Sequence, residues 1–97
     1  MAAHLAVLRM HIHFPGSHSL KAKRSRLKPL MARLHREFNV SVAEVDYLDK
    51  WKDALVCCAL VTSDSGQAQR SLQKVANWLD KHWPDVDIMG EEIEVLP

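Results

Sequence analysis

The spacing of apolar residues changes from one regular period to another between residues 4 and 38, and this change strongly constrains the fold. In residues 4–14 every second side chain from Ala6 to Phe14 is apolar, whereas the residues between them include Arg9, His11 and His13. This period of two is typical of a β-strand with one buried face. Pro15-Gly16 ends this alternation. From residue 20 to residue 38 the apolar residues follow the period of an amphipathic helix, about 3.6 residues. Its apolar stripe consists of Leu20, Leu27, Leu30, Met31, Leu34 and Phe38.

The predicted helix contains a proline, which makes its start less obvious. Ser19 is the expected N-cap, and Ser17 is the alternative. Pro29 in a helix interior removes one backbone hydrogen bond and costs about 3 kcal/mol. Either one helix bends at Pro29, or a shorter helix begins there. The first interpretation is favoured, because Lys28 is a poor cap and residues 17–28 would otherwise form a long loop.

The second half of the chain repeats the change of period. Residues 39–47 alternate and are rich in β-branched side chains, and residues 54–62 are nearly all apolar, so both segments predict strands. Asp64 begins a capping box for a second helix, and residues 86–96 predict a last strand with a bend or bulge near Gly90. The apolar stripe of the second helix consists of Leu72, Val75, Ala76, Leu79 and Trp83.

The resulting order is strand-helix-strand-strand-helix-strand, which predicts an α+β, ferredoxin-like βαββαβ sandwich. In this architecture a four-stranded antiparallel sheet carries two helices on one face. Right-handed crossovers place the first and third strands at the centre of the sheet. A chain of 97 residues is expected to form a single domain over residues 1–97, because single cores typically occupy about 100–150 residues.

Charge is distributed unevenly along the chain, although the formal net charge is only +1. Residues 21–36 contain seven Lys or Arg and no acidic residue. The other residues contain six Lys or Arg and all twelve Asp and Glu. A basic helix on an acidic remainder indicates a polyanionic partner more strongly than the average charge does.

Two segments resemble the YlxP-like family of bacterial proteins. Residues 14–24 read Phe-Pro-Gly-Ser-His-Ser-Leu-Lys-Ala-Lys-Arg, and residues 38–46 read Phe-Asn-Val-Ser-Val-Ala-Glu-Val-Asp, followed by Trp51. The similarity covers essentially the whole chain. It implies a ferredoxin-like fold of unknown function, encoded beside translation-initiation and ribosome-maturation factors. It therefore implies an RNA or ribosome connection by association, and no catalytic residues.

The basic helix and the turn before it form the candidate binding site. Lys and Arg along a helix supply the phosphate contacts that dominate nucleic-acid affinity, so structured or ribosomal RNA is the predicted ligand. Binding is expected through the RNA backbone and shape, because the first strand lacks the aromatic platform of an RNA-recognition motif. The candidate residues are Ser17, His18, Lys21, Lys23, Arg24, Arg26, Lys28, Arg33 and Arg36.

Three other interpretations of this basic segment remain open. The helix could meet an acidic translation-related protein, or it could be a solvated face that keeps the protein soluble. The turn at residues 15–19 precedes a helix N-terminus, where free N–H groups attract anions. A phosphate sensor or phosphate-ester enzyme at that turn is the third and least favoured interpretation.

Lys23 differs from the other basic residues, because it lies at the edge of the apolar stripe beside Leu20, Leu27 and Leu30. Two arrangements fit this position. The stem could run along apolar surface with the ammonium group in water, which is the favoured prediction. Alternatively, the ammonium group could pair with a carboxylate near the start of the helix.

No catalytic, metal or cofactor site is predicted, and the protein is not expected to be an enzyme. Cys57 and Cys58 lie in an apolar strand, which raises a thiol pKa and restricts access. His11 and His13 share a strand face on the side of the sheet without helices, but a metal site needs further ligands. They are interpreted as exposed histidines.

The open face of the sheet is expected to mediate a homodimer. Leu5 and Val7, with Val56 or Leu60 from the third strand, are predicted to form an apolar patch there. No membrane association is expected, because the apolar stripe of the first helix is committed to the core. No targeting segment is expected either, because Arg9 interrupts the apolar start of the chain too early for a signal-peptide core. The two adjacent cysteines favour a reduced, cytoplasmic setting.

Overall fold

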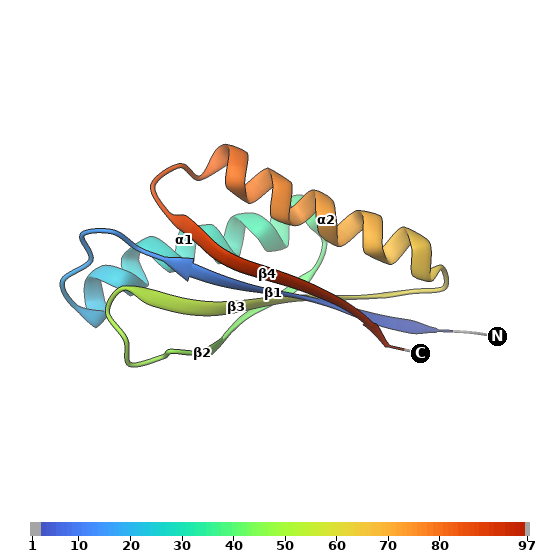
Figure 1. Ribbon diagram of the computed structural model, residues 1–97, viewed down its shortest axis with the longest axis horizontal. Coiled ribbons are helices and arrows are strands. Elements are labelled where there is room, and N and C mark those ends of the chain that lie inside the picture. The colour runs from blue at the N-terminus through green and yellow to red at the C-terminus, as the bar shows by residue number, and fades with distance from the viewer. Residues whose placement is uncertain (1–2, 97) are drawn as a thin grey trace.

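Two helices cover one face of a four-stranded antiparallel sheet in the computed structural model, which describes residues 3–96 (Figure 1). The elements in chain order are β1 (His4–His13), α1 (Leu20–Phe38), β2 (Ser41–Asp46), β3 (Asp53–Thr62), α2 (Ser65–His82) and β4 (Asp87–Leu96). The strand order is β2-β3-β1-β4. The predicted ferredoxin-like fold, with β1 and β3 at the centre, is therefore confirmed.

The core lies between the sheet and the two helices. Alternate residues of β1 point into it, since Ala6, Leu8, Met10 and Ile12 are completely buried. The intervening residues of β1 are only partly covered or exposed, because they lie on the face without helices. The period of two in residues 4–14 thus separates a buried face from an open one.

Both predicted helix caps are confirmed. The Ser19 hydroxyl oxygen accepts a hydrogen bond from the Ala22 N–H (3.0 Å), and an Asp64 carboxylate oxygen accepts one from the Gln67 N–H (3.1 Å). Helix α1 continues without interruption through Pro29, whose side chain is on the solvent side. The interpretation as one helix, instead of one that begins at Pro29, is confirmed, and the bend at Pro29 stays a prediction.

Two bulges interrupt the regular pairing of the sheet. In β4, Met89 is the extra residue between the partners of His11 and Ile12, which confirms the irregularity predicted near Gly90. In β2, Val45 is the extra residue opposite Val56 and Leu55, and no sequence feature predicted it. The chain then leaves β2 through Tyr47, whose φ of 61° is left-handed. This conformation begins the loop that lies beside the start of α1.

Candidate nucleic-acid interface

The turn after β1 sets the position of the first residues of α1. Gly16 has a φ of 77°, which glycine adopts without strain, and the Ser17 N–H donates to the Phe14 carbonyl (3.3 Å). No acidic residue lies in the first turn of the helix. The charge of Lys21 therefore adds to the partial positive charge of the helix N-terminus, and this end of α1 attracts anions.

Lys23 is completely buried, with 0% of its surface exposed. Its ammonium group donates to a Glu44 carboxylate oxygen (2.8 Å) and to the backbone carbonyls of Tyr47 (2.8 Å) and Asp53 (3.0 Å). The favoured prediction of an ammonium group in water is wrong, and the alternative pairing with a carboxylate is confirmed. All three N–H donors are engaged inside the protein, so Lys23 is removed from the candidate binding site.

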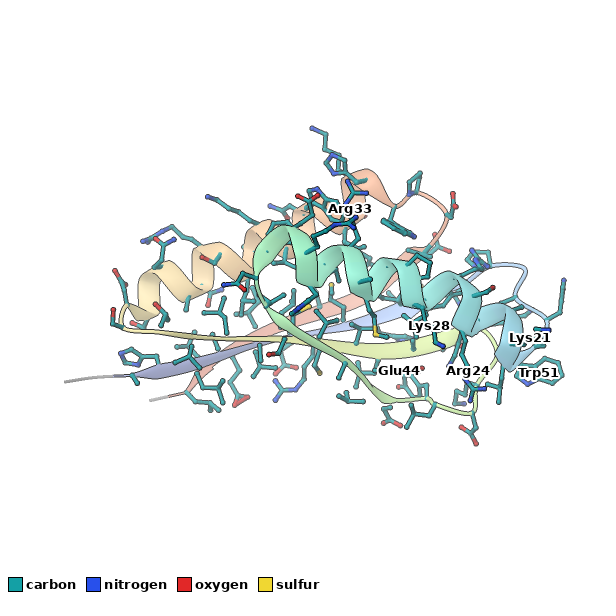
Figure 2. The ribbon with its side chains drawn as sticks, turned by 180° about the vertical axis from the view of Figure 1, so that it is seen from behind. Lys21, Arg24, Lys28, Arg33, Glu44 and Trp51 are labelled. Atoms are coloured by element: carbon teal, nitrogen blue, oxygen red, sulfur yellow. The ribbon has the colours of Figure 1, made fainter. Side chains whose placement is uncertain are left out.

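The pairing of β2 with β3 explains why Glu44 meets this lysine. Glu44 lies opposite Val56, and Val56 points into the core under the helices. Cross-strand partners share a face of the sheet, so Glu44 also points towards α1 (Figure 2). The burial of Lys23 is therefore compensated by a charge partner and two carbonyl groups that come from a different part of the chain.

Two more basic residues of α1 are engaged in contacts within the protein. The Arg26 guanidinium donates to the carbonyls of Pro15 (2.7 Å) and Asp85 (2.9 Å) and lies 5.4 Å from the centre of the Phe14 ring. Arg26 thus joins the turn before α1 to the loop after α2. Arg33 forms an ion pair with Glu37 (3.0 Å) and lies over the ring of Trp78, where the two helices meet.

Lys21, Arg24 and Lys28 form the free flank of α1. Their side chains are exposed, and within residues 3–96 none of them has an ion pair or a side-chain hydrogen bond. Their spacing of three and four residues places them on one side of the helix, over about 10 Å of its axis. Figure 2 shows them along one edge of α1, with Arg33 on the opposite edge.

The other predicted binding residues differ in exposure and in their distance along the chain from the free flank. Ser17 is 2% exposed, and its buried hydroxyl oxygen has no hydrogen-bond partner among the described residues. A ligand on the surface does not reach this oxygen, so Ser17 is removed from the candidate site. His18 is exposed in the turn before α1, and Arg36 is exposed in the last turn of the helix, at the other end.

The loop between β2 and β3 lies beside the start of α1, although none of its residues is among the predicted binding residues. Lys23 binds the carbonyls of Tyr47 and Asp53, one on each side of the loop. Trp51 is exposed in this loop, at the same end of the molecule as Lys21 (Figure 2). A tryptophan between two lysines was the sequence feature that could have added this loop to the candidate site.

On the open face of the sheet, His11 Nε2 and His13 Nδ1 contact the same carboxylate oxygen of Asp53, at 2.8 and 3.2 Å. Burial alone would raise the pKa of this carboxyl group, but the hydrogen bonds and charges of the two histidines outweigh it and hold the pKa below its usual value. The sequence placed the histidines on this face but not Asp53, which is brought there by the pairing of β1 with β3. Within residues 3–96, no cluster of His, Cys, Asp and Glu could hold a metal ion.

The predicted apolar patch on the open face has a different composition from the one expected. Val56 and Leu60 face the helices and pack in or against the core, so the choice of these residues is wrong. The β3 partner of Leu5 is Val61, and both are exposed. The homodimer stays a prediction, and sedimentation at micromolar concentration tests it. A clean monomer there would contradict it.

The two free cysteines occupy opposite faces of β3. Burial raises the pKa of the Cys58 thiol to about 12, and it also raises the pKa of Cys57, which lies on the open face. Neither thiol is activated as a nucleophile at neutral pH.

The comparisons with known proteins agree with the resemblance of residues 14–24 and 38–46 to the YlxP-like family. Residues 5–93 match the family described as "Protein of unknown function (DUF503)". The chain belongs to this family. A Bacillus subtilis (strain 168) protein described as "Uncharacterized protein YlxP" is 36% identical over 69 residues, which are 71% of this chain and 74% of that protein. The resemblance to the YlxP-like family is therefore confirmed.

A solved structure also resembles the whole chain. It is described as "De novo designed protein Foldit4", covers 99% of this chain and 98% of its own, and superposes with a TM-score of 0.55 at 12% identity. This likeness concerns the fold alone. Neither helix of this DUF503 chain, within the described residues, is long and apolar enough to cross a membrane.

Proposed function

We propose that this protein binds structured RNA, ribosomal RNA included, through the free flank of α1. The observation that carries the proposal is the contrast among the basic residues of one helix. Lys23, Arg26 and Arg33 are engaged within the protein, whereas the free flank leaves three cations exposed on one side. Phosphate groups are the partners that such a row of cations binds most readily.

The position of the free flank on the helix adds to its attraction for anions. Its first residue, Lys21, lies in the first turn, where the helix itself carries a partial positive charge and no acidic residue compensates it. Like charges at these spacings destabilise an isolated helix, so an external polyanion would stabilise the arrangement. Catalysis is not part of the proposal. Because ribosomes are cytoplasmic, the proposal includes a cytoplasmic location.

The test measures the affinity for labelled fragments of purified ribosomal RNA by fluorescence anisotropy at several salt concentrations. Three phosphate contacts predict a slope of about −2 to −3 in a plot of log affinity against log salt. Between 50 and 200 mM salt the affinity should then fall roughly 15- to 60-fold. The triple variant K21E/R24E/K28E should lose this binding and keep its fold.

A matched control distinguishes the effect of the free flank on RNA affinity from the effect of net charge. The variant R70E/K74E/K81E makes the same three charge reversals on exposed positions of α2, so both triple variants change the net charge by −6. The control should retain most of the RNA affinity. Absence of salt-dependent binding by the wild-type protein, or equal losses in both triple variants, would contradict the proposal.

The same cations would also suit an acidic protein, which is the alternative function. Capture of cellular partners on the immobilised protein, with and without nuclease treatment, distinguishes the two. Partners that disappear after nuclease treatment agree with RNA binding. An acidic translation-related protein that remains bound after nuclease, and is lost with the K21E/R24E/K28E variant, would favour the protein-interaction function.

A further inference from the structure

Trp51 leaves much of a large aromatic ring in water. It is 55% exposed, whereas Trp78 and Trp83 pack against the core. Burying an aromatic side chain is one of the larger stabilising contributions in a small domain. Because the Trp51 ring is largely exposed, it contributes little of this free energy to folding. A contact of the exposed ring with another molecule would account for a tryptophan at this position.

The loop that carries Trp51 is fixed on both sides of it. On one side, the Tyr47 carbonyl accepts hydrogen bonds from the buried Lys23 ammonium group (2.8 Å) and from the Lys50 N–H (3.0 Å). On the other side, the Lys52 carbonyl accepts a hydrogen bond from the Phe14 N–H (2.7 Å). An aromatic ring on an anchored loop binds a flat partner with a smaller loss of conformational entropy than one on a mobile loop.

The ring lies at the end of the molecule where the free flank begins. Figure 2 shows Trp51 at the same end of the molecule as Lys21 and Arg24, and the contacts of Lys23 join the loop to this end of α1. Lys50 and Lys52 flank the tryptophan in the sequence, and the Lys50 ammonium group lies 5.7 Å from the centre of the Tyr47 ring in the same loop. Cations beside an exposed aromatic ring are the combination with which proteins hold the backbone and the base of a single-stranded nucleotide.

We propose that Trp51 stacks on an unpaired base of the RNA, next to the segment whose phosphates lie on the free flank. The proposal rests on the RNA-binding function proposed above and names the kind of RNA, one with an unpaired nucleotide in a loop, bulge or end. Bases inside a duplex already stack on their neighbours, so they do not offer a face to the ring. The tryptophan thereby adds a preference for unpaired RNA to contacts that otherwise follow the backbone.

The experiment compares two labelled RNA probes of equal length in nucleotides, a hairpin with an unpaired loop and a fully paired duplex. Trp51→Ala should weaken binding to the hairpin by about 5- to 150-fold, as loss of one stacked base does, and leave binding to the duplex unchanged. Trp51→Phe keeps an aromatic face and should lose less. The slope of log affinity against log salt should stay at its wild-type value, because no phosphate contact is removed.

Leu48→Ala is the matched control. Leu48 lies in the same loop and is 57% exposed, but it has no aromatic face. It should bind both probes as the wild-type protein does. Equal losses in Leu48→Ala and Trp51→Ala would indicate an apolar contact, such as one with a protein, and would overturn the stacking proposal.

The outcomes separate this proposal from the function on which it rests. If wild-type protein binds RNA with the expected salt dependence and Trp51→Ala binds the hairpin equally well, stacking is wrong and the RNA-binding function stands. If wild-type protein shows no salt-dependent binding to either probe, the RNA-binding function itself is wrong. Because Trp51 is so exposed, the melting temperature of Trp51→Ala should match that of the wild type, which excludes misfolding as the cause of a loss.

Discussion

The two helices occupy equivalent places in the fold, but they contribute different side chains to it. Helix α2 buries only apolar residues, whereas α1 buries three leucines and Lys23. The exposed side of α2 carries both basic and acidic residues, such as Lys81 and Asp80, whereas residues 21–36 of α1 contain basic residues and no acidic ones. The first helix therefore combines a structural role with a concentration of positive charge, and the second mainly completes the core.

The difference shows that charge in a sequence does not by itself identify a binding surface. Of the basic residues in α1, Lys23 and Arg26 hold separate parts of the chain together, and Arg33 lies where the helices meet. Among residues 3–96, the free flank has no such contacts. A basic residue that contributes to the fold and one that is available to a ligand should respond differently to substitution, and the following variants measure this difference.

The largest loss of stability is expected from Lys23→Met. The substitution leaves the Glu44 carboxylate and two carbonyl groups without their partner, and breaking a buried ion pair in this way typically costs about 3–5 kcal/mol. Urea unfolding measures the loss. Lys28→Met is the matched control in the same helix, because Lys28 is exposed and unpaired, and its effect should stay within about 0.5 kcal/mol.

If Lys23→Met does not fold, Glu44→Gln provides a milder test, because it keeps the shape of the side chain and removes the charge. It should be less stable than wild type but still unfold cooperatively. Equal stability of Lys23→Met and Lys28→Met would contradict the structural role of Lys23.

A smaller loss is expected from Arg26→Ala. The variant removes two hydrogen bonds from a charged donor to backbone carbonyls and the contact of the guanidinium with the Phe14 ring. We expect a decrease of about 1–2 kcal/mol in the free energy of unfolding, since these groups are partly exposed to water. Arg24→Ala, two residues earlier on the free flank, should change stability by less than about 0.5 kcal/mol. Equal effects would mean that Arg26 does not join the two loops in solution.

Most of the fold could be predicted from local patterns. The bounds of α1, its Ser19 cap and the order of the strands follow from the period of the apolar residues and from single capping positions. The environment of Lys23 could not be predicted in the same way. It depends on the pairing of β2 with β3 and on the bulge at Val45, and these place Glu44 and two carbonyl groups around one side chain.

The candidate site was predicted only in part, for the same reason. Residue type and position identified Lys21, Arg24 and Lys28 as candidates, together with six other residues. They did not show that Arg26 is engaged with the loop after α2, because Asp85 is distant in sequence. Nor did they show that the loop carrying Trp51 lies beside the start of α1. Contacts between distant segments decide which basic residues remain available to a ligand.

A pH-dependent effect is expected from Asp53, whose pKa is lower in the folded protein than in the unfolded chain. The folded state therefore favours the carboxylate. Asp53 contributes stability above its ordinary pKa of about 4, and this contribution disappears as the pH falls through the lower folded value. Urea unfolding between pH 6 and pH 2.5 should show a smaller loss in Asp53→Asn than in wild type. The substitution keeps the backbone carbonyl that accepts from Lys23, so the two roles of residue 53 are separated. Identical pH profiles would contradict the link to His11 and His13.

The smallest effect has the opposite sign and connects the free flank with the stability of α1. Lys21→Glu places a negative charge in the first turn, where it meets the positive end of the helix and can pair with Arg24 three residues later, so it should stabilise the protein by about 0.3–1 kcal/mol. Arg36→Glu makes the same charge change in the last turn and should destabilise the protein by a similar amount. Thermal unfolding at low salt measures both, and the two shifts should shrink together as salt is added. If Lys21→Glu gains stability and loses RNA affinity, Lys21 contributes to RNA binding although it lowers the stability of α1. A loss of stability in Lys21→Glu would instead make it a structural residue like Lys23, and the contrast between the two sides of α1 would no longer hold.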